Sequence, residues 1–274
     1  MGTSTEPFDS YPHPVKLILA DLDGTVTADD LGPLDCEDLR ELRRLNELSR
    51  TDPTVPPISL ITGRPHSYLE AFARFLSTPL PSLFESGCGM HLPAERLGHE
   101  YAFHPALAAP EILALVNRFR AWAEEELAAK RGAGVILGKR YSVSIATAGC
   151  CPVEELQALV ENVPGDLAGK FFVTRSIDVV DVTPRPVDKG AGLDWLLDRL
   201  RADGLDLGPE NVLGIGDSFN DLPFLSKVGL SCAVGTGAEK IKRDVAYVTA
   251  AGPGDAVAEV AELARGLNRR LTSE

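Results

Sequence analysis

Short apolar runs alternate with amphipathic segments along most of the chain. Residues 15–20 (VKLILA) form a mostly apolar run, which is typical of a strand buried on both faces of a sheet. Leucines then recur every three residues between positions 39 and 48, and this spacing predicts an amphipathic helix. A second short strand is expected over residues 58–61, followed by a helix with Pro65 in its first turn. The alternation predicts an α/β fold with a doubly wound parallel sheet.

The pattern changes after Phe84, in a glycine-rich segment that is typical of a crossing between domains. The elements expected beyond it are a helix over residues 106–130, a β-rich hairpin over 135–147, a helix over 153–163 and two strands over 171–174 and 177–182. Their order, αββαββ, predicts a separate small α+β domain. A helix over residues 189–202 then resumes the doubly wound pattern, so the small domain is expected to be an insertion.

These patterns divide the chain into three predicted parts. Residues 1–14 are polar and contain prolines, without the apolar region of a secretory signal, and we expect a flexible lead-in there. Residues 15–87 and 184–274 are expected to form the doubly wound core, and residues 88–183 the inserted cap domain. No apolar run reaches the ~18 residues of a transmembrane helix, so we expect a cytoplasmic protein that does not enter membranes.

Charge and cysteine content narrow the classes of function. The formal net charge is −13, which argues against a nucleic-acid or anionic-membrane partner because such partners require a basic surface. An acidic protein that binds an anionic metabolite needs a cation to offset the charge, and this directs attention to metal sites. The five cysteines include no C-x-x-C pair and predict neither a disulfide framework nor a zinc site.

Two aspartates follow the first predicted strand directly. Asp21 and Asp23 lie in the segment DLDGT, residues 21–25. One carboxylate can attack phosphorus to give an acyl phosphate, and a second carboxyl group nearby can protonate the leaving oxygen and later activate water. The alternative interpretation is a plain turn that caps the next helix.

Two weaker signals come from Thr62-Gly63 and Lys189. The hydroxyl and backbone N–H groups of Thr62-Gly63 follow the second strand and can hold phosphoryl oxygens, although such a pair is equally common in ordinary loops. Lys189 stands at the start of a helix, where the helix dipole disfavours a cation. It either balances a nearby group of anions or is a solvated surface lysine.

The segment GDSFND, residues 216–221, follows another predicted strand. Its two acids and one amide on a tight turn suit Mg²⁺, which prefers hard oxygen ligands. A calcium loop of the EF-hand type is the competing interpretation, but the alternating acids and the distal glutamate of that loop are missing. Ligands of open α/β sheets bind beyond the carboxyl ends of the strands, so all four segments are expected to converge there.

The order and spacing of these segments resemble the haloacid dehalogenase-like hydrolase superfamily. DLDGT matches its motif I, the Thr62 segment motif II, Lys189 motif III and GDSFND motif IV. The αββαββ insert is similar to the C2B type of cap, as found in phosphatases of the Cof, sucrose-phosphatase and mannosyl-3-phosphoglycerate phosphatase groups. The resemblance implies a Mg²⁺-dependent phosphatase that acts on a small phosphorylated metabolite, namely a sugar phosphate or a phosphorylated sugar acid. We expect a monomer or small homo-oligomer.

The resemblance also implies a role for each motif residue. Asp21 is expected to be the nucleophile and Asp23 the general acid and base. The residues expected to hold the phosphoryl group are Thr62, Gly63, Lys189 and Asn220. The residues expected to bind Mg²⁺ are Asp21, Asp23 through its backbone carbonyl, Asp217 and, nearby or through water, Asp221.

Substrate choice is expected to depend on the cap, because such a domain closes over the site and excludes water. The candidate contacts are Arg64, His104, Lys139, Arg140, Arg175 and Ser176, each of which also has an interpretation as an ordinary surface or ion-paired residue. Two other functions stay open. A sugar phosphomutase would share Asp21, Asp23 and the cap, whereas a non-catalytic binding protein would be expected to have lost Asp21 or Asp217.

Overall fold

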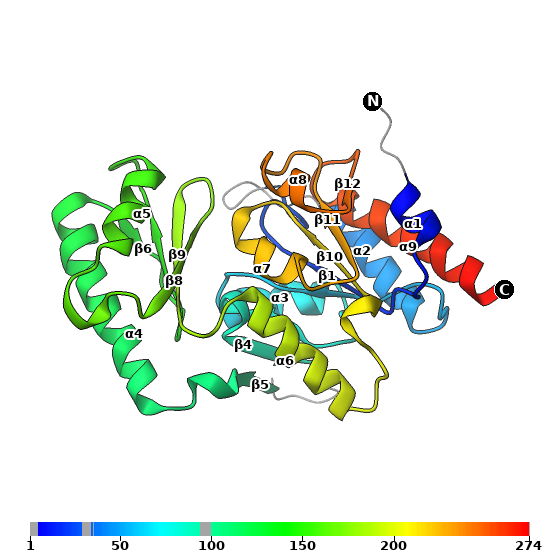
Figure 1. Ribbon diagram of the computed structural model, residues 1–274, viewed down its shortest axis with the longest axis horizontal. Helices are drawn as coiled ribbons and strands as arrows, with labels where there is room; N and C mark the ends of the chain where they lie inside the picture. The colour runs from blue at the N-terminus through cyan, green and yellow to red at the C-terminus, as the bar shows by residue number, and fades with distance from the viewer. Residues whose placement is uncertain (1–4, 29–33, 35, 94–99, 274) are drawn as a thin grey trace.

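The computed structural model describes residues 5–28, 34, 36–93 and 100–273 (Figure 1). A larger lobe surrounds a parallel sheet, and a smaller lobe, formed by the middle of the chain, lies beside it. None of the helices in these described segments is long and apolar enough to cross a membrane.

The larger lobe is built on a five-stranded parallel sheet. Its strands, in spatial order, are β12 (Tyr247–Val248), β11 (Leu230–Ala233), β10 (Val212–Gly216), β1 (Leu17–Ala20) and β2 (Ile58–Leu60). In the middle of the sheet, Ala20 lies opposite both Ile215 and Leu60. The chain segments that follow these strands therefore leave the sheet at the same edge.

Helices cover both faces of this sheet, which confirms the doubly wound fold. On one face lie α2 (Cys36–Ser49), α3 (His66–Phe75) and α9 (Asp255–Ser273); on the other lie α6 (Lys189–Ala202), α7 (Leu222–Leu225) and α8 (Ile241–Asp244). Ile18 and Ala20 of β1 pack on the face covered by α2, α3 and α9, whereas Leu17 and Leu19 pack on the face covered by α6, α7 and α8. Burial on both faces is the reason why this strand is apolar throughout.

A small antiparallel sheet extends the larger lobe. It consists of β3 (Ser82–Phe84), β4 (Gly89–Leu92) and β5 (Glu100–Phe103) in that order. Met90 of β4 packs in the same apolar layer as α6. The sequence predicts only a crossing segment here and places residues from 88 onward in the cap; the structure instead packs β4 against the core, and the chain crosses to the smaller lobe after β5.

The smaller lobe confirms the αββαββ order. Its elements are α4 (Pro110–Trp122), continued by π-helical turns over Ala123–Ala129, then β6 (Gly134–Val135), β7 (Val143–Ala146), α5 (Val153–Glu161), β8 (Phe171–Arg175) and β9 (Val179–Pro184). The strands form an antiparallel sheet in the order β6-β7-β9-β8. Ile145, Val180 and Val182 pack under α4 and α5. The opposite face of the sheet is turned toward the larger lobe (Figure 1).

The prediction of a flexible lead-in over residues 1–14 is wrong for residues 5–14. This segment forms a short helix, α1 (Glu6–Ser10), whose Phe8 side chain is buried. The ring of Phe8 packs edge-on against Tyr247, and Arg270 of α9 donates a hydrogen bond to the Phe8 carbonyl. A single apolar residue thus anchors an otherwise polar segment; residues 1–4 lie outside the described part of the chain.

Candidate active site

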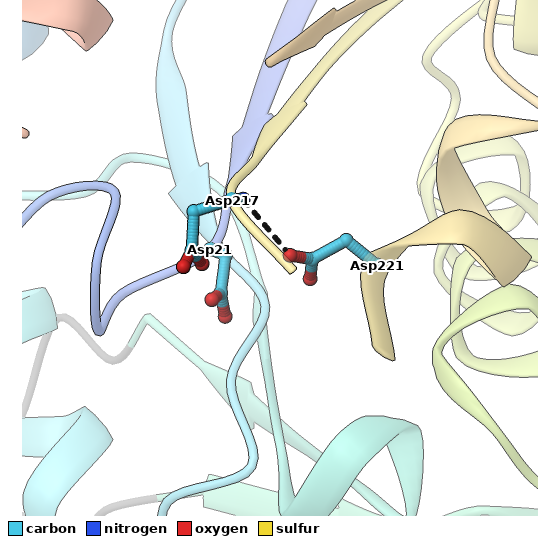
Figure 2. Close-up of side chains that lie close together, drawn as sticks. All are labelled: Asp21, Asp217 and Asp221. Carbon is cyan, nitrogen blue, oxygen red and sulfur yellow. Dashed lines mark hydrogen bonds between the residues drawn. The ribbon is translucent and has the colours of Figure 1, made fainter. Parts of the chain in front are cut away.

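Three carboxylates meet at the carboxyl edge of the parallel sheet (Figure 2). Asp21 directly follows β1, Asp217 directly follows β10, and Asp221 lies in the short 3₁₀ helix η6 (Phe219–Asp221). One carboxylate oxygen of each residue lies within 4.8 Å of those of the other two. Asp21 and Asp217 come together because β1 and β10 are adjacent parallel strands in register.

Lys189 forms ion pairs with two of these carboxylates. Its Nζ atom lies 2.7 Å from Oδ1 of Asp21 and 2.7 Å from Oδ1 of Asp221, and the side chain is 1% exposed. Although burial opposes the charge, the two carboxylates raise the pKa of Lys189, so the ammonium group stays charged. The structure thus places Lys189 among the carboxylates and not on the surface.

Asp21 carries an unfavourable charge in this arrangement. Burial and the negative charges of Asp221 and Asp217 raise the pKa of Asp21 well above its usual range, while Lys189 acts in the opposite direction. Three carboxylates with one ammonium group leave a net negative charge, which a divalent cation would offset. The site therefore fits Mg²⁺, which prefers carboxylate oxygens.

Asp221 already has its hydrogen bonds within the protein. One oxygen accepts a hydrogen bond from Lys189, and the other accepts the backbone N–H groups of Asp217 and Ser218, each at 3.1 Å. Figure 2 shows the bond between Asp217 and Asp221. These bonds fix the turn that carries Asp217. Asp21 and Asp217, which follow adjacent strands, would hold a metal ion, and Asp221 would position the turn of Asp217.

The carboxylate of Asp23 lies outside this cluster of three. It receives two hydrogen bonds from Arg64, Nε to Oδ2 at 2.7 Å and Nη2 to Oδ1 at 2.9 Å. Both side chains are only about one-fifth exposed (22% and 18%). This paired hydrogen bonding fixes the orientation of the Asp23 carboxyl group. Its backbone carbonyl remains the predicted metal ligand.

Gly24 allows the loop after β1 to approach Asp217. Its φ is +79°, and a Cβ atom at this position would lie 2.5 Å from Oδ2 of Asp217. Only glycine satisfies both the backbone conformation and the close contact.

The predicted phosphate-binding residues border the same space. Thr62 and Gly63 follow β2, and the Thr62 hydroxyl accepts the backbone N–H of Arg64 at 3.1 Å. Oδ1 of Asn220 lies 3.5 Å from Nζ of Lys189 and accepts a hydrogen bond from the Ser218 hydroxyl at 2.9 Å. The structure brings these residues together; their roles stay predictions.

A cavity of about 810 Å³ opens above the carboxylates, with walls from both lobes. Of the candidate substrate contacts, Arg64, Lys139, Arg175 and Ser176 line it. His104 and Arg140 do not border it, contrary to expectation. The His104 ring packs against Trp195 and its Nδ1 accepts the N–H of Ala106, while the Arg140 guanidinium lies over the Phe103 ring at 5.1 Å.

The cavity is also lined by Ser144, Glu154 and Asp181, which the sequence did not identify as candidates. Lys139 contacts Ser144, and its Nζ lies 3.4 Å from Oδ1 of Asp181; Glu154 pairs with Arg175. Ser144 and Asp181 are directly opposite each other on β7 and β9. For Ser144 and Asp181 the available signal was the alternation of a strand, because each stands between two apolar residues that face the helices. Glu154 lies in the helix α5, where this signal does not apply.

Comparison with known proteins agrees with this geometry. The profile of a family described as haloacid dehalogenase-like hydrolase matches residues 144–260, which include Lys189 and the turn with Asp217 and Asp221. This part of the chain is similar to the haloacid dehalogenase-like hydrolases. This match agrees with the resemblance inferred from the four motifs, and the doubly wound core with an inserted cap is the fold that the resemblance implies.

Similar proteins of known name cover nearly the whole chain. A phosphoglycolate phosphatase of Methanopyrus kandleri is 27% identical over 89% of this chain and 94% of its own length. A phosphoglycolate phosphatase of Methanothermobacter thermautotrophicus is 26% identical over 89% and 96%. Among solved structures, the sucrose-phosphatase of Synechocystis sp. PCC6803 shares the fold with a TM-score of 0.63 at 18% identity, over 92% of this chain and 98% of that one.

Proposed function

We propose that this hydrolase is a Mg²⁺-dependent phosphatase that removes phosphate from a small metabolite through an aspartyl phosphate on Asp21. The observation that carries the proposal is the buried contact of Lys189 with both Asp21 and Asp221 at the sheet edge, beside Asp217. An ammonium group and a bound divalent cation together would allow Asp21 to stay ionised in spite of its burial. The names of the relatives, which are phosphatases, support the reaction class.

In the first step, a carboxylate oxygen of Asp21 attacks phosphorus and the bond from phosphorus to the leaving oxygen breaks. Asp23 donates a proton to that oxygen. In the second step, Asp23 takes a proton from water, the water oxygen attacks phosphorus, and phosphate leaves with regeneration of the Asp21 carboxylate. When bound, Mg²⁺ would neutralise negative charge on the phosphoryl group and the carboxylates.

We infer that the substrate is a sugar phosphate or a phosphorylated sugar acid. Three cationic side chains of the cavity wall each pair with a carboxylate: Arg64 with Asp23, Lys139 with Asp181 and Arg175 with Glu154. Such pairs offer a donor and an acceptor side by side, which suits hydroxyl groups. The cavity is also of the size that binds compact organic ligands.

Phosphoglycolate is the second candidate substrate, favoured by the names of relatives that align over 89% of this chain. It is smaller than a sugar phosphate, and beyond its phosphate group it carries a carboxylate and no hydroxyl group. The paired state of Arg64, Lys139 and Arg175 suits the hydroxyl groups of a sugar or sugar acid, which phosphoglycolate lacks.

The test is phosphate release from a panel that contains glucose 6-phosphate, fructose 6-phosphate, 3-phosphoglycerate, 2-phosphoglycolate and 4-nitrophenyl phosphate, with Mg²⁺ and with EDTA. We expect release that requires Mg²⁺ and is fastest with a sugar phosphate. Transfer of phosphate between sugar positions without net release, dependent on a bisphosphorylated activator, would indicate a phosphomutase. We also propose that the protein acts in the cytoplasm as a monomer or small homo-oligomer, without a nucleic-acid or membrane partner.

A further inference from the structure

Glu85, from the larger lobe, binds a backbone segment of the smaller lobe. Its side chain is buried, and Oε1 accepts the N–H of Arg140 at 2.8 Å. Oε2 accepts the N–H groups of Tyr141 at 2.7 Å and Ser142 at 2.8 Å, and it also lies 3.3 Å from the Ser142 hydroxyl. One carboxylate thus satisfies three consecutive backbone donors of the loop between β6 and β7.

The backbone around Glu85 connects this contact to the phosphate-binding segment. Glu85 and Ser86 have φ values of +49° and +55°, a left-handed conformation that few residues other than glycine adopt. The N–H of Glu85 donates to the Arg64 carbonyl at 3.0 Å, and that of Ser86 donates to the Thr62 carbonyl at 2.9 Å. The turn that presents the Glu85 carboxylate is therefore hydrogen-bonded to the loop of Thr62 and Arg64.

The bound loop also packs where the chain passes between the lobes. Tyr141 forms a small apolar cluster with Cys88, Leu107 and Val187. Cys88 and Leu107 lie on the way into the smaller lobe, and Val187 lies on the way back to the core. The Glu85 contact therefore lies beside the two chain segments that connect the lobes.

Two polar residues of the cavity flank the bound loop. Lys139 precedes it and Ser144 follows it, and both contact Asp181 of β9. The Asp181 carboxylate reaches the core as well, because a Cβ atom on Gly63 would lie 3.7 Å from its Oδ2. A fixed loop therefore sets how Lys139, Ser144 and Asp181 stand over the phosphate-binding segment.

We propose that Glu85 is a positioning residue that fixes the cap hairpin, so that Lys139 and its partners contact the part of the substrate beyond phosphorus. The role in substrate binding rests on the proposed phosphatase function. Glu85 touches neither the carboxylate cluster nor the cavity; it acts through the loop that carries Lys139.

The variants Glu85→Gln and Lys139→Ala, alone and combined, test the proposal. Glu85→Gln keeps the size of the side chain but turns one oxygen into an NH₂ group, which cannot accept a backbone N–H. Asn268→Ala is the matched control, because buried Asn268 also holds backbone groups, the N–H and carbonyl of Val15 and the carbonyl of Thr54, at the opposite edge of the sheet.

Amide hydrogen exchange tests, without any ligand, whether Glu85 holds the backbone of residues 140–142. In Glu85→Gln we expect the amides of residues 140–142 to exchange about tenfold faster than in the wild type, as the loss of one hydrogen bond to a charged group predicts. Asn268→Ala should leave them unchanged. Wild-type protection of these amides in Glu85→Gln would overturn the proposal.

Steady-state kinetics test whether Glu85 affects substrate binding through Lys139. We expect Glu85→Gln to raise the KM of the panel member with the highest kcat/KM by about tenfold, with a smaller effect on 4-nitrophenyl phosphate. In the Lys139→Ala background the same substitution should have little further effect, because coupled residues are not additive. Equal losses in both backgrounds would overturn the role through Lys139. If the wild type hydrolyses no phosphate ester, the phosphatase proposal fails, and the exchange result alone decides whether Glu85 holds the loop.

Discussion

At the scale of single residues, the site depends on the balance between one ammonium group and three carboxylates. Lys189, Asp21 and Asp221 are almost fully buried, so water screens their charges poorly. Each charge is held in place by the others and, for Asp221, by two backbone N–H groups. Removal of any one of them is expected to change both stability and catalysis.

Replacement of Lys189 by methionine should be strongly destabilising without metal. It leaves two buried carboxylates without their partner, and breaking a buried pair in this way costs about 3–5 kcal/mol of unfolding free energy. Urea unfolding in EDTA measures the loss, and Mg²⁺ should restore part of it. Lys227→Met is the control, since Lys227 pairs with Asp194 at the surface and its loss should change little. Equal effects of the two substitutions would contradict the role of Lys189.

The raised pKa of Asp21 predicts how the stability of the metal-free protein depends on pH. Burial and the charges of Asp221 and Asp217 make the folded state hold the Asp21 proton more tightly than the unfolded state does, where the pKa is about 3.9. The contribution of Asp21 to the free energy of unfolding is therefore fully present below the pKa of the unfolded state, and it is lost as the pH rises through the raised pKa of the folded state.

Asp21→Asn should remove this part of the pH dependence and should be more stable than the wild type at neutral pH in EDTA. Urea unfolding between pH 4 and 8 measures the difference. If Asp21→Asn were less stable than the wild type over the whole range, the charge of Asp21 would not destabilise the metal-free protein, and the prediction would be wrong.

At the scale of elements, the site depends on the close approach of the loop after β1, which contains Gly24, and the loop after β10, which contains Asp217. Gly24→Ala should abolish most activity, because the new Cβ would meet the Asp217 carboxylate. Gly204→Ala is a matched control: its φ is +89°, and no atom lies within 4 Å of the added Cβ. Both variants should lose about 1–2 kcal/mol of stability from the left-handed backbone. Only Gly24→Ala should lose Mg²⁺-dependent phosphate release, and normal activity in this variant would contradict the geometry.

The elements that carry the site could be predicted because their patterns are strong. A run buried on both faces identified β1, and leucine spacing identified α2 and α6. The elements that were missed depend on contacts distant in sequence. α1 is held by Phe8 against Tyr247, and β4 pairs with β3 around a turn with left-handed Glu85 and Ser86, a conformation that local propensity does not predict.

At the scale of the whole molecule, the reaction site lies between two lobes that are interleaved in sequence. The motif residues Asp21, Thr62 and Asp217 could be placed together because the strands before them are parallel and end at one edge of the sheet. The cap side of the cavity was less predictable, because it depends on which face of the small sheet turns toward the core. Lys139 was a candidate, but its contacts with Ser144 and Asp181 depend on the pairing of β7 with β9.

The most direct test of the account is detection of a phosphoryl group on Asp21. Asp23→Asn should accept phosphate from 4-nitrophenyl phosphate in the presence of Mg²⁺ but release it slowly, because the group that activates water is missing. Acid quenching, followed by mass spectrometry of the peptide that contains residue 21, should then show one added phosphoryl group. The same peptide from Asp21→Asn should show none. A phosphoryl group on another residue, or phosphate release by Asp21→Asn at the wild-type rate, would contradict the account.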